Sequence, residues 1–181
     1  NLVEPQSSGI GGGGFLVHFS EASGDIDAYD GRETAPAAAA ADRFLGASGE
    51  PMTFFDAVVG GLSVGVPGLL RMLEAAHRDH GKLPWRRLFE PAIALAESGF
   101  AMSVRLHALV AADKHLGTFR EARTYFYTPA GEAKAAGTTL VNRPFAETLR
   151  TVAEDGADAF YGGEIARDIV RAVRGAARHP S

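Results

Sequence analysis

The chain has 181 residues, about the length of one domain and enough to bury a hydrophobic core. Its 46% hydrophobic and 22% charged residues exclude a disordered or collagen-like chain, and no apolar run reaches the roughly 18 residues that span a bilayer, so we expect no membrane segment. The chain has no Cys, which excludes disulfides and thiolate metal sites, and its net charge of -4 argues against a nucleic-acid partner.

The first 30 residues predict a β-hairpin that follows a glycine-rich loop. Residues 1 to 14 end in a run of glycines, and residues 15 to 19 (FLVHF) are typical of a buried strand. Residues 20 to 24 have the composition of a turn, and residues 25 to 29 alternate polar and apolar side chains. Two strands make a sheet too small to be stable alone, so we expect most of the sheet to come from chain outside this sequence.

The rest of the chain is predicted to be mostly helical. Apolar residues recur at helical spacing from about residue 66 to Gly81, from Pro84 to Gly99 with a break at Pro91, after the N-cap Ser103 as far as Leu116, from Asn142 to about Ala153, and from Glu164 to about Gly175. Residues 36 to 60 combine an Ala-rich stretch, a turn and a second apolar stretch, and residues 125 to 129 read as a polar connection. No linker divides the chain, so the fold class is predicted to be α+β, a hairpin followed by a helical layer.

Two short motifs match known signatures by spelling. Gly9, Gly11 and Gly14 fit the dinucleotide pattern G-x-G-x-x-G, but that fingerprint needs a strand before it and a helix after it, and here a strand follows. A tight loop, or a backbone lying beside a ligand or a catalytic element, is the better interpretation. Gly61 to Gly65 fits the nucleophile elbow G-x-S-x-G around Ser63, but the predicted helix starts several residues too late.

The histidines and aromatic residues are weaker candidates for a site. His77 and His80 have the spacing to share one helix face as metal ligands, yet no further ligand cluster is evident and solvated residues at a helix end are favoured. His107 and His115 lie in helical patterns, and His179 lies in the tail. Trp85, Tyr125 and Tyr127 are more typical of packing residues than of a stacking platform, and no metal site is expected.

Arg32 is the residue that physical reasoning singles out. Residues 1 to 60 hold nine acidic side chains and only two basic ones, Arg32 and Arg43. Arg32 follows the second predicted strand, where the chain turns outward, and a planar guanidinium there can grip a carboxylate with two charge-assisted hydrogen bonds. The alternative, a surface ion pair with Glu33 or Asp30, stays open on this reasoning.

An ordered series of motifs resembles the large subunit of γ-glutamyltranspeptidases. The series runs through residues 3 to 15 (VEPQSSGIGGGGF), 30 to 36 (DGRETAP), 65 to 68 (GVPG), 83 to 85 (LPW), 91 to 93 (PAI), 96 to 100 (AESGF) and 160 to 163 (FYGG). It covers nearly the whole chain in family order, and the glycine run followed by Gly-Arg-Glu-Thr-Ala-Pro is its most specific part.

The resemblance implies part of the four-layer αββα sandwich of an N-terminal-nucleophile hydrolase. Such a precursor cuts itself into a large and a small subunit, and the Thr that opens the small subunit attacks the γ-glutamyl amide to form an acyl-enzyme. Water or the amine of an amino acid then accepts the γ-glutamyl group. The family's motif Arg binds the α-carboxylate of the γ-glutamyl moiety, which assigns Arg32 to substrate binding; Glu33 receives no catalytic role.

Several expectations accompany this resemblance. Residues 1–181 are expected to be the large-subunit portion of one domain, truncated at both ends, with the small subunit as partner, glutathione or a related γ-glutamyl compound as substrate, and no cofactor. No residue of the chain is expected to be catalytic: the nucleophilic Thr lies outside it, and Thr34, Thr138 and Thr139 do not open a chain. The chain alone should be inactive, and family habit suggests a periplasmic or secreted bacterial enzyme.

Three alternatives remain beside this hypothesis. A glutaryl or cephalosporin acylase, or a poly-γ-glutamate-processing relative, would share the fold. A non-catalytic binding module would lack a downstream Thr-led segment. A serine hydrolase built on Ser63 is the third.

Overall fold

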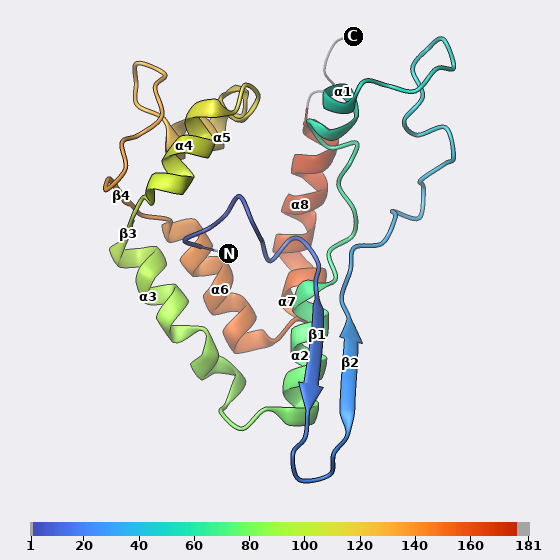
Figure 1. The fold of residues 1–181 in the computed structure, drawn as a ribbon, viewed down its shortest axis with the longest axis vertical. Coiled ribbons are helices and arrows are strands. Elements are labelled where there is room, and N and C mark those ends of the chain that lie inside the picture. The colour runs from blue at the N-terminus through green and yellow to red at the C-terminus, as the bar shows by residue number, and fades with distance from the viewer. Residues whose placement is uncertain (1, 177–181) are drawn as a thin grey trace. The chain divides into compact units, whose positions relative to one another are not determined.

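The computed structural model describes residues 2–176. In chain order the elements are β1 (Phe15–Phe19), β2 (Ile26–Asp30), α1 (Phe54–Val58), α2 (Leu69–His80), the 3₁₀ helix η1 (Trp85–Leu88), α3 (Glu90–Ser98), β3 (Phe100–Ala101), α4 (Val104–Ala112), the 3₁₀ helix η2 (Leu116–Thr118), α5 (Arg120–Phe126), β4 (Thr139–Leu140), α6 (Arg143–Asp155), α7 (Asp158–Tyr161) and α8 (Gly163–Gly175) (Figure 1). The α+β prediction, a hairpin followed by mostly helical chain, is confirmed.

The chain divides into two compact units, each built from two stretches of sequence. The hairpin unit consists of Ile10–Lys82 with Asp155–Ser181, and the helical unit consists of Asn1–Gly9 with Leu83–Glu154. Among residues 2–176, no helix combines the length and the apolar character needed to cross a bilayer.

In the hairpin unit, β1 and β2 pair antiparallel and pack one face against α2 (Figure 1). Residues alternate between the two faces of a strand, so Leu16 and His18 are partly covered while Phe15, Val17 and Phe19 are exposed. The hairpin itself was predicted, but the prediction that Phe15–Phe19 is a buried strand is wrong for the described chain. Only one face of the hairpin meets other described residues, and the other face is left open.

Polar contacts join α2 to α7 within the hairpin unit. The Arg71 guanidinium forms an ion pair with Asp158 at 2.6 Å and lies 5.0 Å from the centre of the Tyr161 ring. The Glu74 carboxylate accepts a hydrogen bond from the backbone N–H of Ala157 at 2.7 Å. These contacts connect the N-terminal half of α2 to a segment more than 80 residues further along the sequence.

The helical unit packs around a small core that includes Phe100, Met102, Leu106, Val110 and Leu140. Three of its boundaries follow from capping and turn chemistry that the sequence shows. Ser103 caps α4 by accepting a hydrogen bond from the N–H of Leu106, and Asn142 accepts one from the N–H of Phe145 at the start of α6. Gly99, at φ 90°, ends α3 in a conformation that favours glycine.

The structure departs from the prediction at three places in the helical unit. The helix after Ser103 ends at Ala112 and not at Leu116, because the Asp113 carboxylate accepts hydrogen bonds from the N–H groups of His115 and Leu116. The segment predicted as a polar connection contains α5, where Tyr125 and Phe126 pack on the core. The two-residue strands β3 and β4, which the sequence analysis missed, are too short to show any periodicity.

Candidate functional site

The backbone around Arg32 leaves the hairpin and passes between two glycine-containing segments. On one side, Gly14 and Gly31 exchange two backbone hydrogen bonds of 3.2 and 2.9 Å, which extend the hairpin. A Cβ atom on Gly13 would lie 2.6 Å from the Gly31 carbonyl oxygen and 2.8 Å from the Arg32 Cα. The glycine run therefore lets two backbones approach more closely than any side chain allows.

The second glycine-containing segment covers the other side of the same backbone. A Cβ atom on Gly68 would lie 2.4 Å from the Gly31 carbonyl oxygen and 2.7 Å from that of Arg32. The Gly12 carbonyl accepts hydrogen bonds from the N–H groups of Gly68 and Leu69, both at 3.1 Å, where α2 begins. The loop before β1, the Arg32 segment and the start of α2 thus form one closely packed set of backbones.

The Arg32 side chain is exposed to solvent. It is 55% exposed and its Nη2 lies 3.2 Å from Glu33 Oε2, while its backbone N–H donates to Asp30 Oδ1 at 2.9 Å. The surface ion pair with Glu33, one of the two readings of this residue, is present. An exposed pair of this kind contributes about 0–1 kcal/mol, so a ligand carboxylate can displace Glu33 at little cost.

In the described part of the hairpin unit Arg32 lines a cavity together with Thr34, and the same two residues also line a second cavity. The first has a volume of about 650 Å³ and is also lined by Arg71, Met72 and Tyr161. The second, of about 630 Å³, is lined by Glu33, Arg43 and Ser63. Arg71 and Tyr161 were not predicted as neighbours of Arg32, because they reach the first cavity from α2 and α7.

The nucleophile elbow around Ser63 is not formed. Helix α1, not a strand, precedes the motif, and α2 begins only at Leu69. The Ser63 hydroxyl donates a hydrogen bond to the Val58 carbonyl at 2.8 Å, so it serves to close a turn. The dinucleotide fingerprint is not formed either, because strand β1 follows the glycine run where a helix would have to begin.

The prediction that His80 is a solvated residue at a helix end is wrong. The His80 ring stacks on the His18 ring with centroids 3.8 Å apart, and its Nε2 lies 3.3 Å from Asp27 Oδ2. His77 belongs to no such cluster among residues 2–176. His18 and Asp27 were not predicted as site residues, although pairing the two predicted strands places them opposite each other.

The aromatic residues have the packing roles that were predicted. The Trp85 indole N–H donates to the Val152 carbonyl at 3.0 Å, and Tyr125 and Tyr127 lie against the core of the helical unit. His107 Nδ1 lies 2.8 Å from the Lys134 carbonyl oxygen, and His179 lies outside the described residues.

Burial perturbs one tyrosine near the histidine cluster. The pKa of Tyr29 is raised above its ordinary value, first by desolvation and then by its hydrogen bond to Asp79 and the negative charges of Asp79 and Asp27. The raised pKa extends the pH range over which the Tyr29 hydroxyl keeps its proton, and the hydroxyl donates to Asp79 Oδ2 at 2.9 Å.

Comparisons with known proteins identify the fold. The chain superposes on γ-glutamyltranspeptidase from Helicobacter pylori with a TM-score of 0.87 and 32% sequence identity, over 94% of this chain and 48% of that one. The fold is therefore part of the αββα sandwich of N-terminal-nucleophile hydrolases, as the resemblance implied.

The family follows from sequence comparison. The family model described as Gamma-glutamyltranspeptidase matches residues 1–177. The glutathione hydrolase proenzyme of Bacillus subtilis strain 168 is 38% identical over 175 residues, and Scoloptoxin SSD14 of Scolopendra dehaani is 38% identical over 178 residues. The chain belongs to the γ-glutamyltranspeptidase family. The two alignments cover 96% of this chain but only 30% of the Bacillus subtilis proenzyme and 29% of Scoloptoxin SSD14.

Proposed function

We propose that this chain is the substrate-binding part of an enzyme that cleaves γ-glutamyl amides such as glutathione, with Arg32 holding the α-carboxylate of the γ-glutamyl group. The observation that carries the proposal is the geometry of Arg32. Its backbone is fixed between Gly13 and Gly68, while its guanidinium is exposed beside two cavities.

The chemistry of the guanidinium fits this role. Its planar fork donates two parallel hydrogen bonds to a carboxylate, and the fixed backbone limits how far the fork can wander. In the free state Glu33 occupies part of the fork at 3.2 Å. A substrate carboxylate that displaces Glu33 gains both hydrogen bonds, and the Glu33 carboxylate, which is 30% exposed, turns to water.

The reaction itself needs groups that lie on the partner subunit of the same precursor. In the proposed mechanism the hydroxyl of a Thr at a chain start attacks the γ-carbonyl carbon, and its proton passes to the α-amine of that Thr. The C–N bond of the amide breaks, the leaving amine takes the proton, and a γ-glutamyl ester forms. Water hydrolyses the ester, or an amino-acid amine takes the acyl group. Arg32 fixes the far end of the substrate through these steps, and this chain supplies no catalytic residue.

The open face of the hairpin is evidence for an interface with a partner subunit. Phe15, Val17, Phe19 and Ile26 are between 61% and 70% exposed, and they alternate along paired strands on one side. A contiguous apolar face of this kind marks a protein interface. We infer that the small subunit covers it and that residues 1–181 are the large-subunit part of one domain. We also propose that the enzyme is periplasmic or secreted, as the family resemblance suggests.

The test is release of the chromophore from a γ-glutamyl anilide by the product of the complete reading frame. Arg32→Ala removes both hydrogen bonds, each of which contributes about 1.5–3 kcal/mol, so kcat/KM should fall by roughly 10²- to 10⁴-fold. Arg32→Lys keeps the positive charge but loses the paired hydrogen bonds, so its kcat/KM should lie between those of the unaltered protein and Arg32→Ala. A glutaryl amide keeps the terminal carboxylate that Arg32 would bind and lacks only the α-amine, so it should be the poorer substrate for a γ-glutamyl enzyme and the better one for an acylase.

Arg171→Ala is the matched control, because Arg171 is also an exposed Arg paired with a nearby carboxylate, Asp168, on α8. It should leave kcat/KM unchanged. Equal losses in the Arg32 and Arg171 variants would sink the assignment of Arg32, and an inactive complete product would sink the proposed reaction.

A further inference from the structure

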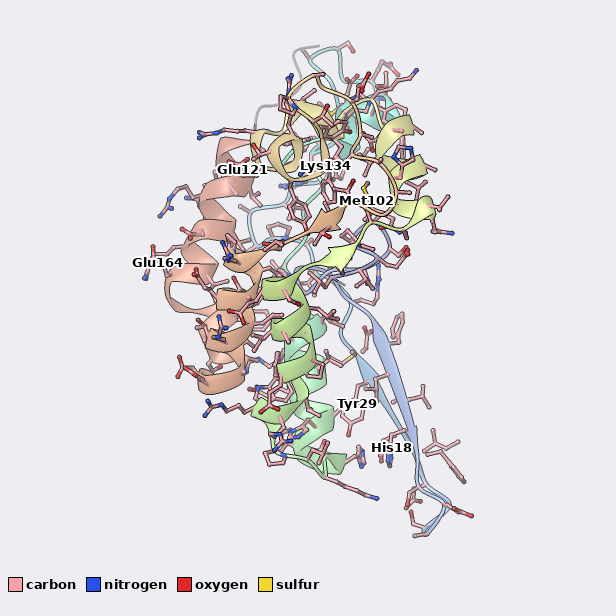
Figure 2. The ribbon with its side chains drawn as sticks, turned by 90° about the vertical axis from the view of Figure 1, so that its left-hand side faces the viewer. His18, Tyr29, Met102, Glu121, Lys134 and Glu164 are labelled. Atoms are coloured by element: carbon pink, nitrogen blue, oxygen red, sulfur yellow. The ribbon has the colours of Figure 1, made fainter. Side chains whose placement is uncertain are left out.

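Three side chains that could bind a metal ion converge between the hairpin and the end of α2. His18 lies on β1, Asp27 on β2 and His80 in the last turn of α2, and one ligand atom of each lies within 4.8 Å of the other two. Figure 2 shows His18 and Tyr29 on the side of the hairpin that faces α2. All of these residues belong to the hairpin unit.

The hairpin register brings together two of the three ligands. His18 and Asp27 are directly opposite each other in the antiparallel pair, so their side chains emerge on the same face a short distance apart. That face packs against α2, whose last residue before Gly81 is His80. The three ligands thus come from three elements that the fold holds together independently of any ion.

The polar atoms of the cluster are not all used by the protein. His18 Nδ1 is buried and has no hydrogen-bond partner among residues 2–176, an arrangement that normally costs free energy. His80 Nε2 faces the Asp27 carboxylate at 3.3 Å and the Tyr29 hydroxyl at 2.8 Å. Tyr29 also donates to Asp79 at 2.9 Å, so its hydroxyl keeps a partner if His80 turns to another one.

We propose that His18, Asp27 and His80 form a binding site for a borderline divalent cation of the Zn²⁺ type. Two imidazole nitrogens and one carboxylate oxygen are a ligand set that suits Zn²⁺, with a water as the fourth ligand of the tetrahedron, as in other zinc sites that have three protein ligands. The planes of the stacked His18 and His80 rings differ by 11°. On binding, the rings tilt apart so that one nitrogen lone pair of each ring points at the ion. Tyr29 and Asp79 form the outer hydrogen-bonded layer around His80.

The site has a structural consequence that does not depend on the proposed reaction. An ion held by β1, β2 and α2 ties the far end of the hairpin, near the turn at residues 20–25, to the end of the helix. Because the ion binds only when these elements are assembled, binding adds to the stability of the folded state.

The test is Zn²⁺ binding to the full-length gene product, purified without a polyhistidine tag and stripped with a chelator. Isothermal titration should show one saturable site per chain, and Co²⁺ should give the intense visible absorption of a tetrahedral complex. His80→Gln and Asp27→Asn should each raise the Zn²⁺ dissociation constant by at least roughly 10- to 100-fold. That is the typical effect of losing a residue of the outer hydrogen-bonded layer, and these two residues bind the ion directly. His18→Gln should do the same.

His77→Gln is the matched control, since it removes a histidine from the same helix, one turn before His80. It should bind Zn²⁺ as tightly as the unaltered protein. Circular dichroism and thermal unfolding without metal establish that each variant is folded, and Zn²⁺ should raise Tm in the unaltered protein and His77→Gln but not in Asp27→Asn. The proposal is overturned if no saturable site is found, or if Asp27→Asn and His80→Gln bind like the unaltered protein.

Discussion

Two tyrosines of the helical unit show how much the fate of one hydroxyl decides. The Tyr127 hydroxyl donates to the Val110 carbonyl at 3.0 Å. The Tyr125 hydroxyl is buried and has no hydrogen-bond partner among residues 2–176. Removing the two hydroxyls should therefore change the free energy of unfolding in opposite directions.

We expect Tyr125→Phe to stabilise the protein by about 1 kcal/mol, because it removes an unsatisfied buried group. Tyr127→Phe breaks a hydrogen bond and should destabilise it by about 0.5–1.5 kcal/mol. Urea unfolding of both variants at neutral pH measures the two values. The same sign for both variants would contradict the assigned hydrogen bonding.

The Tyr125 hydroxyl also predicts an alkaline loss of stability. Desolvation by burial raises the pKa of Tyr125 above its ordinary value of 10.0. Below pH 10 the Tyr125 hydroxyl keeps its proton in both the folded and the unfolded chain, so its titration takes nothing from the free energy of unfolding. As the pH rises through 10 towards the folded pKa, the unfolded state releases its proton first and stability falls. The loss of stability above pH 10, followed by urea unfolding, should be smaller in Tyr125→Phe.

At the level of elements, the close packing of the glycine loop against the Arg32 segment is the feature most sensitive to a single methyl group. Gly13→Ala places a Cβ 2.6 Å from the Gly31 carbonyl oxygen, so the backbones must move apart. We expect a loss of about 1–3 kcal/mol in unfolding free energy and a fall in kcat/KM as Arg32 shifts.

Gly11→Ala is the matched control for this prediction. A Cβ on Gly11 meets nothing within 4 Å, so its stability should stay within about 0.5 kcal/mol of the unaltered protein. Thermal unfolding and anilide kinetics on the complete product measure both effects. Equal behaviour of the two variants would show that the loop moves freely away from Arg32.

The elements that the sequence predicted correctly are those with strong local signals. The cap Ser103, the helix start at Asn142, the stop at Gly99 and the apolar spacing of α2 all depend on residues close together in the sequence. Helix α5 was missed because its apolar face is made by Tyr125 and Phe126, whose partners lie elsewhere in the chain.

The candidate sites were predictable only where a motif or a pairing marks them. Arg32 stands out by its position after a strand, and the motif series named the family. His18, Asp27 and His80 come together through the strand register and the packing of α2, and spacing along the sequence shows only the register. His77 and His80 had the suggestive spacing, yet only His80 reaches the cluster.

For the molecule as a whole, the open face of the hairpin predicts how the 181-residue chain behaves alone. Apolar surface leaving water contributes about 25 cal/mol per Å², so the exposed face drives association. We expect the isolated chain to form oligomers or aggregates in size-exclusion chromatography with light scattering, and Val17→Lys to reduce them.

Val104→Lys is the control for this effect. Val104 is 75% exposed on α4, in the helical unit, and lies outside the hairpin face. The same substitution there should leave the oligomers unchanged. A monodisperse monomer of the unaltered chain would refute the prediction.

The interleaving of the two units has a consequence for the order in which the chain folds. The helical unit is complete in sequence at Glu154, but the hairpin unit needs α7 and α8 after it. During synthesis the unit that starts second is therefore finished last. A folded helical unit would shorten the flexible loop between Lys82 and Asp155 and lower the entropy cost of bringing α7 to α2.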